Sequence, residues 1–223
     1  MEKYQLLQDF FDLGGNHKPK ELKEARHKMV EYLKTDDDTQ IKDTILVIDA
    51  MLEIGASSDI TATYKIAEPI FERLGNIVEW DFIDIRLFTF IAPCAENFEE
   101  SYLLVKKSLE QLENFKHEKN YLRIKTASYC NFAGRLLKAK CCDAHYQNQA
   151  TEIDNLFAEY IDKAIVLCVE NNFPLWAAVA LIRKGLYYNR QDLINKGLDT
   201  IKAANEDELY RLMEKEIKDC SPF

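Results

Sequence analysis

Small residues recur between large apolar residues, at helical spacing, in four separate stretches of the chain. Offsets of three and four residues place each set on one face of a helix, where the small residue lets a neighbouring helix approach closely. The recurrence predicts stacked helical hairpins, an irregular repeat array rather than a single bundle. The four units are Tyr64–Ala67–Phe71, Val105–Ser108–Leu112, Ile161–Ala164–Cys168 and Ile194–Gly197–Ile201.

Apolar periodicity and helix-boundary signals along the chain predict eleven helices. They are expected over residues 2–13, 19–34, 41–53, 59–75, 78–91, 97–115, 121–140, 151–170, 174–188, 192–204 and 206–219. Residues 141–150 are expected to form an irregular insertion, and Asn205 with Glu208 predicts a capping box for the last helix. No stretch shows the two-residue alternation of a strand over a useful length. The fold class is therefore predicted to be all-α.

The composition agrees with this fold class, because Gly and Pro, which break helices, occur only 7 and 5 times in 223 residues. No segment rich in Gly, Pro or Ser separates one part of the chain from another. We therefore expect residues 1–223 to form a single helical repeat domain that behaves as one cooperative unit.

The formal net charge of −9 excludes an extended nucleic-acid surface, since phosphate binding needs clustered Lys and Arg. No apolar run reaches the roughly 18 to 20 residues of a membrane span. The first residues, Met-Glu-Lys-Tyr, lack the apolar core of a signal peptide. A cytoplasmic protein with no membrane contact is the expectation.

Residues that could carry chemistry are few. Cys141, Cys142 and His145 could form part of a metal site, but adjacent cysteines are not the usual ligand pair and no second cluster follows. Phosphate-binding loops and nucleophile-elbow motifs do not occur. Asp81 and Asp84 are the only carboxylate pair that suggests catalysis, and their spacing is more typical of the polar edge of a helix. We therefore expect neither enzymatic activity nor a bound metal or cofactor.

Two sets of residues carry a resemblance to known helical-repeat families. The first, which resembles the junction between two tetratricopeptide (TPR) repeats, is Lys163-Ala164-Ile165, Leu167, Asn171-Asn172 and Trp176. The second comprises Glu79-Trp80-Asp81-Phe82 through Phe90, the helix Tyr121–Leu137, and Ile182-Arg183-Lys184-Gly185-Leu186-Tyr187 leading to Lys196-Gly197-Leu198. Over nearly the whole chain this set resembles the C-terminal repeat domain of the Rgg/MutR group of peptide-responsive transcription regulators.

The resemblance implies a superhelical array of TPR-like hairpins that binds a short signalling peptide in its concave groove. It also implies a homodimer formed through terminal helices, and an effect on transcription, as in quorum sensing. Members of that group carry an N-terminal helix-turn-helix domain, whereas residues 1–60 show no short turn before a basic recognition helix. The chain is thus expected to be the regulatory part alone or a stand-alone relative, without direct nucleic-acid binding.

Polar stripes on the first helices of the predicted hairpins are the candidate peptide site. An Asn side chain can hold a peptide bond through its donor and acceptor, and an Arg can clamp a carboxylate with two hydrogen bonds. For the stripe with Ser128, Asn131 and Arg135, the alternative is a solvated helix face. For the stripes with Arg86 and with Arg183, the alternative is ordinary packing with the arginine reaching solvent. The candidate peptide-binding residues are Arg86, Phe90, Ser128, Asn131, Arg135, Trp176 and Arg183.

Two further functions are open beside peptide binding. A protein–protein interaction scaffold of the same architecture would take the helix of a folded partner in its groove. An enzyme would need a buried carboxylate pair in a pocket, for which Asp81 and Asp84 are the candidates.

Overall fold

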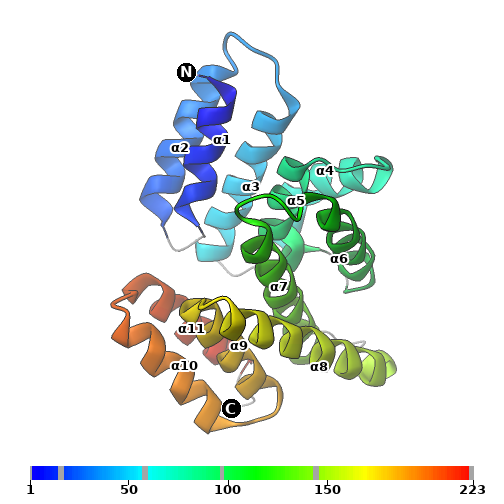
Figure 1. Ribbon diagram of the computed structural model, residues 1–223, viewed down its shortest axis with the longest axis vertical. Helices are drawn as coiled ribbons and strands as arrows, with labels where there is room; N and C mark the ends of the chain where they lie inside the picture. Colours follow the sequence, from blue (N-terminus) through cyan, green and yellow to red (C-terminus); the bar gives the residue numbers. More distant parts are fainter. Residues whose placement is uncertain (1, 15–17, 57–59, 96–97, 143–145, 221–223) are drawn as a thin grey trace. The chain divides into compact units, whose positions relative to one another are not determined.

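The computed structural model describes residues 2–14, 18–56, 60–95, 98–142 and 146–220. Within these ranges the chain forms eleven α-helices and two short 3₁₀ turns, with no strand, so the all-α prediction is confirmed (Figure 1). The chain divides into two compact units, Met1–Glu96 and Asn97–Phe223. That residues 1–223 behave as one cooperative unit stays a prediction, as does the superhelical curvature.

Unit 1 contains two helical hairpins and a fifth helix. Its helices are α1 (Lys3–Leu13), α2 (Pro19–Tyr32), α3 (Thr39–Ala56), α4 (Ile60–Asn76) and α5 (Phe82–Ile91). Helix α1 packs on α2 and α3 on α4, while α5 lies against α3. The loop Ile77–Asp81 precedes α5, so this helix is shorter than the predicted 78–91.

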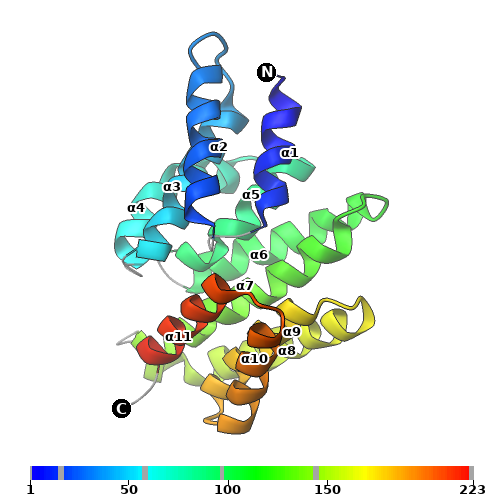
Figure 2. The same cartoon turned by 90° about the vertical axis from the view of Figure 1, so that its left-hand side faces the viewer.

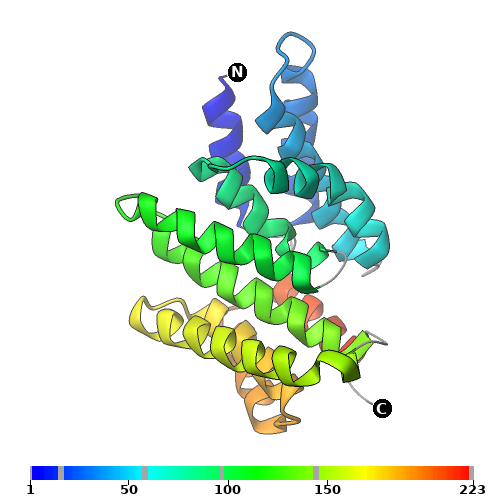
Figure 3. The ribbon, with the colours of Figure 1, turned by 90° about the vertical axis from the view of Figure 1, so that its right-hand side faces the viewer.

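Unit 2 continues the pairing of successive helices. Its helices are α6 (Phe98–Leu112), α7 (Tyr121–Cys142), α8 (Tyr146–Glu170), α9 (Pro174–Tyr187), α10 (Gln191–Ala203) and α11 (Asp207–Cys220). Figure 3 shows α6, α7 and α8 side by side, and α9 pairs most closely with α10. The first helices of the two hairpins, α7 and α9, also contact each other directly.

The four small-residue units lie on α4, α6, α8 and α10. Helices α4, α8 and α10 are the second helices of the pairs α3–α4, α7–α8 and α9–α10. Their small residues, Ala67, Ser108, Ala164 and Gly197, are all buried. The interpretation of these positions as helix-packing faces is therefore confirmed. Tyr64 alone among the large residues stays partly exposed, where its ring stacks on that of Phe71.

Helices α9 and α10 approach each other closely. A Cβ atom placed on Gly197 would lie 2.6 Å from the main-chain oxygen of Ala178 and 2.5 Å from Cγ1 of Ile182. One turn away, Gly185 on α9 has the same relation to Ile194 on α10, at 2.7 Å. Each helix thus has a glycine where it contacts the other, and the absence of a side chain at these two positions lets the backbones pack closely.

Three successive helix junctions in unit 2 end with the same turn. Asn172, Asn189 and Asn205 have positive φ values of 54°, 53° and 57°, the left-handed conformation that asparagine adopts more readily than most residues. After each asparagine, the next residue donates its main-chain N–H to the carbonyl five positions earlier, as from Arg190 to Gly185 at 2.7 Å. These bonds satisfy helix-end carbonyls and set the reversal of the chain.

Two boundary predictions need correction. Helix α7 extends through Cys142 and α8 begins at Tyr146, so most of the predicted insertion at 141–150 is helical; residues 143–145 lie outside the described residues. Asn205 ends α10 in the left-handed conformation, and α11 begins only at Asp207. The predicted capping box of Asn205 with Glu208 is therefore wrong, because the asparagine serves the preceding helix instead.

In the part of the chain that the structure describes, no helix combines the length and the apolar character needed to cross a membrane.

Substitution Gly197→Ala tests the close packing of α9 and α10. We expect it to lower the free energy of unfolding by about 1–3 kcal/mol, because the new methyl group meets a main-chain oxygen that cannot move aside. The matched control is Gly75→Ala in α4, whose Cβ would have nothing within 4 Å and which should leave stability unchanged or raised by up to about 1 kcal/mol. Urea unfolding followed by circular dichroism measures both, and equal effects of the two substitutions would contradict the packing.

Candidate binding face on α7 and α9

The predicted peptide-binding residues fall into two groups. Arg86 and Phe90 lie on α5 in unit 1. The other five lie in unit 2: Ser128, Asn131 and Arg135 on α7, and Trp176 and Arg183 on α9. Since α7 and α9 pack together, only the second group shares a surface that can be described from its own contacts.

Arg86 and Phe90 pack against the first helix of the chain. The Arg86 guanidinium carbon lies 3.6 Å from the ring centre of Phe11, close enough for a cation–π contact. The Phe90 ring lies 5.3 Å from that of Phe10 and 6.3 Å from that of Phe11. Both side chains therefore hold α1 on α5, which favours the packing alternative for this stripe.

On α7, the polar stripe is mostly buried. Ser128 and Arg135 are only 1% and 4% exposed, so a peptide would reach them only after their neighbours had moved. Asn131 on α7 and Trp176 on α9 are partly exposed. These two remain accessible for contact with a ligand.

Arg183 occupies a socket made by three helices of unit 2. Its Nε and Nη2 donate to the two carboxylate oxygens of Glu216 on α11, at 2.7 and 3.0 Å. Its Nη1 donates to the main-chain oxygen of Cys130 on α7, at 2.9 Å. A Cβ atom at Gly134, one turn further along α7, would lie 2.7 Å from the guanidinium carbon. The missing side chain of Gly134 is thus what allows the guanidinium to lie flat against α7.

The pair is nearly removed from water, with side-chain exposures of 12% for Arg183 and 11% for Glu216. Burial alone would raise the pKa of Glu216, but the charge and hydrogen bonds of Arg183 outweigh burial and hold that pKa below its ordinary value. Burial would likewise lower the pKa of Arg183, but Glu216 and Cys130 reverse this and raise it. Both groups therefore stay charged, and each depends on the other because an unpaired buried charge is costly.

Helix α11 packs against α7 and α9 (Figure 2). Few of its side chains besides Glu216 are buried. Of its fourteen residues only Met213 and Cys220 are buried, whereas the longer α8 buries six. Met213, Glu216 and Cys220 are three and four residues apart and so share one face of the helix. The face of α7 and α9 thus accepts an amphipathic helix through an apolar contact and a carboxylate.

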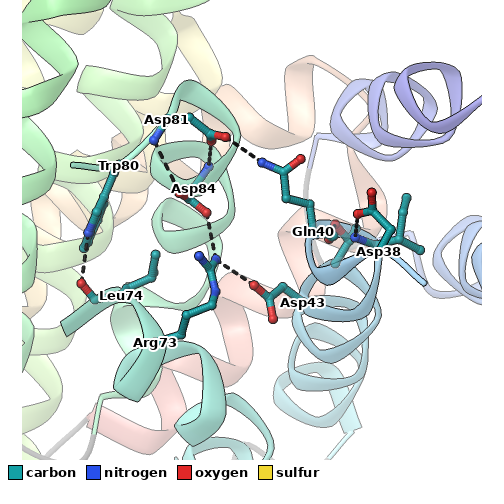
Figure 4. A network of polar contacts seen from close by, with 10 residues as sticks. Asp38, Gln40, Asp43, Arg73, Leu74, Trp80, Asp81 and Asp84 are labelled. Atoms are coloured by element: carbon teal, nitrogen blue, oxygen red, sulfur yellow. Dashed lines mark hydrogen bonds and ion pairs between the residues drawn. The ribbon is translucent and has the colours of Figure 1, made fainter. Parts of the chain in front are cut away.

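Unit 1 contains a second buried charge cluster, drawn in Figure 4. Nη2 of Arg73 on α4 lies 2.6 Å from Asp43 Oδ2 on α3 and 2.7 Å from Asp84 Oδ1 on α5. Burial raises the pKa of Asp43 above its ordinary value, and the nearby negative charge of Asp84 adds to this effect. The charge and hydrogen bond of Arg73 oppose it. The cluster joins α3, α4 and α5.

The carboxylate pair considered for catalysis has a local structural role. Asp81 accepts the main-chain N–H of Asp84 at 2.8 Å, and Asp84 accepts that of Asp81 at 3.3 Å, which together form a capping box at the start of α5. Gln40 on α3 donates to the second oxygen of Asp81 at 2.6 Å. Among the described residues, no group of three or more His, Cys, Asp or Glu side chains could hold a metal ion.

Sequence reasoning missed three parts of the Arg183 socket: Glu216, Gly134 and the main-chain oxygen of Cys130. One signal was present, because a glycine inside a long apolar helix usually has a packing reason. Gly134 is such a residue, near the middle of α7. The partner carboxylate gave no comparable signal.

Comparison of the chain with protein-family models, with curated proteins and with solved structures found no match.

The Arg183–Glu216 pair can be tested by a double-mutant cycle. We expect Arg183→Met to lower the free energy of unfolding by about 3–5 kcal/mol, because Glu216 is left buried without its partner. The double variant Arg183→Met/Glu216→Met should recover most of that loss, since neither charge remains.

A matched control is Arg190→Met. It breaks an ion pair with Asp192 that also has two hydrogen bonds, but both side chains are about 60% exposed. We expect this substitution to leave stability unchanged. Urea unfolding measures all variants. Equal effects of Arg183→Met and Arg190→Met would contradict the role given to burial.

Proposed function

We propose that this protein is a helical-repeat interaction module that binds an acidic amphipathic helix of a partner protein on α7 and α9. The observation that carries the proposal is the Arg183 socket, which presents a buried guanidinium to whatever lies over this face. In the chain itself, the helix that lies over this face is α11, whose Glu216 pairs with Arg183. Helix α11 thus serves as an internal example of the ligand.

The chemistry of the face specifies the kind of helix it would take. A ligand needs a carboxylate that reaches Arg183, because a guanidinium and a carboxylate form two parallel hydrogen bonds. It needs an apolar residue three positions before the carboxylate, as Met213 precedes Glu216, and a small residue four positions after it, as Cys220 follows. These are helix-in-groove anchors, spaced by the helix repeat.

A partner helix must compete with α11, and the small buried contact of α11 makes competition feasible. The apparent affinity of the partner falls in proportion to the fraction of time for which the face is uncovered. Segments with few buried apolar contacts open more readily than the rest of a fold. Two buried side chains and one ion pair therefore make α11 the element of unit 2 that we expect to open most readily.

A short signalling peptide, as the resemblance to the Rgg/MutR group implies, is a second candidate ligand. The partial exposure of Asn131 and Trp176 favours it, because an Asn can bind the backbone of an extended peptide. A second copy of the chain, offering its own α11, would be a third source of the same helix and would give the expected homodimer.

Binding of the α11 sequence as a separate peptide tests the proposed function. The probe is a fluorescein-labelled peptide of residues 205–220, and the receptor is the full chain with Met213→Ala and Glu216→Gln, which loosen its own α11. We expect this variant to bind the peptide at least about tenfold more tightly than the wild-type chain does, by fluorescence anisotropy. The single variant Glu216→Gln provides a milder receptor if the double variant unfolds.

Two controls make the result specific. A peptide with Glu216→Lys should fail to bind, and the loosened receptor carrying Arg183→Met should lose most of its affinity. Binding that survives both changes would contradict a carboxylate-specific face. A folded, loosened receptor that binds no peptide would also contradict the proposal.

A further inference from the structure

Two cysteines meet where α7 and α11 end. The Cys141 thiol, in the last turn of α7, donates to the main-chain oxygen of Cys220 at 3.7 Å, and Cys220 is the last residue of α11. Neither residue takes part in a disulfide in the structure. We propose that Cys141 and Cys220 form a reversible disulfide on oxidation, which fixes α11 over the face of α7 and α9.

The geometry brings the two side chains within reach of each other. The Cys141 sulfur lies 3.7 Å from the main-chain oxygen of Cys220, and disulfides join Cβ atoms about 3.5–4.5 Å apart. The side chain of Cys220 is also close enough to the Cys141 thiol to lower its pKa. Helices α7 and α11 are already packed together, so closing the bond needs only local adjustment.

Cys141 is also the cysteine most open to an oxidant among those whose side chains are described, because Cys94, Cys130, Cys168 and Cys220 are all buried. The hydrogen bond from Cys220 and the charge of Lys140 hold the pKa of the Cys141 thiol below its ordinary value, against partial burial and Glu216. Burial raises the pKa of Cys168 to about 12. Since the thiolate is the reactive form, oxidation should begin at Cys141.

Hydrogen peroxide can supply the oxidising equivalents. The Cys141 thiolate attacks one peroxide oxygen, the O–O bond breaks, and the products are a sulfenic acid and hydroxide, which takes up a proton to become water. The Cys220 sulfur then attacks the sulfenic sulfur, the S–O bond breaks, and a second water leaves. Overall, two thiols and one peroxide give one disulfide and two waters, and a thiol reductant reverses the reaction by exchange.

The bond would change the behaviour of α11 more than that of any other helix. It would join residues 79 positions apart, at the opposite end of α11 from its connection to α10. Helix α11 would then be tied at both ends, with the Arg183–Glu216 pair between them. If this face is the binding site proposed above, oxidation closes it and reduction opens it again.

Peptide mapping tests the disulfide independently of binding. The wild-type chain is treated with hydrogen peroxide near stoichiometry and digested without reductant. We expect a linked pair of peptides containing Cys141 and Cys220, with the loss of two hydrogens, and a melting temperature higher by about 5 °C or more because a long loop is closed. Cys141→Ser and Cys220→Ser should abolish both effects, whereas Cys142→Ser should keep them.

Other products would overturn the proposal. These are a bond between Cys141 and Cys142, a bond between Cys142 and Cys220, or Cys141 oxidised to sulfinic acid while Cys220 stays reduced. An unmodified Cys141 after treatment would overturn it as well.

The consequence for binding rests on the proposed function and is measured separately. Peroxide treatment of the Glu216→Gln chain, with the peroxide removed afterwards, should abolish binding of the residue 205–220 peptide carrying Cys220→Ser. Cys141→Ser in that chain should make binding insensitive to the treatment. Unchanged binding by a chain whose Cys141–Cys220 bond has formed would overturn the closing role of the disulfide. If the reduced chain binds no peptide, the proposed function fails, while the peptide map still decides the disulfide.

Discussion

A buried arginine without a carboxylate is too costly to persist, and this constraint organises unit 2. Arg183 lies between α7 and α9 with its guanidinium flat against Gly134 and bonded to the carbonyl of Cys130. Neither contact supplies a negative charge. The balancing charge must come from a segment that lies over both helices, and Glu216 of α11 supplies it. The position of α11 on this face thus follows from one ion pair.

The same constraint underlies the selectivity that we propose for this face. An apolar surface would accept many amphipathic helices, since the hydrophobic effect has no direction. A guanidinium at its centre rejects any helix that cannot bring a carboxylate to it, because the charge would then be desolvated and unpaired. The apolar contact around it is small, with Met213 and Cys220 as the buried members of α11. In the proposed binding, affinity and specificity therefore depend mainly on the same ion pair.

Local features of the fold could be predicted from the sequence, because they depend on residues close together in the chain. The helices follow from apolar periodicity, and the packing role of Ala67, Ser108, Ala164 and Gly197 follows from their spacing between large residues. The capping box of Asp81 and Asp84 is equally local, but the two residues were considered as a carboxylate pair. Asn205 was predicted to cap the start of the last helix, but it forms the left-handed turn after α10. Asparagine is common in both positions, so the sequence alone could not separate them.

The site depends on tertiary geometry, and so its partners could not be predicted. Arg183 was singled out on α9 as a peptide-binding residue, and its partner could not be predicted. Glu216 lies 33 residues later in a helix with several other acidic residues, and only the rotation of α11 decides which of them faces α9. Ser128 and Arg135 shared a helix face with Asn131 by spacing, yet the burial of that face differs along its length. Arg86 and Phe90 were predicted to bind peptide because a cation and an aromatic ring share one helix face. In the structure both side chains pack against Phe10 and Phe11 of α1, which lie far from them in the sequence.

The proposed binding requires that α11 can separate from α7 and α9 without unfolding the rest of unit 2. Native-state hydrogen exchange of the full chain in increasing urea tests it most directly, by comparing the amides of residues 213–220 in α11 with those of residues 178–187 in α9. We expect the α11 amides to exchange through a partial opening, with a lower free energy and a weaker urea dependence than the α9 amides. Equal opening free energies and equal urea dependence for the two helices would contradict it.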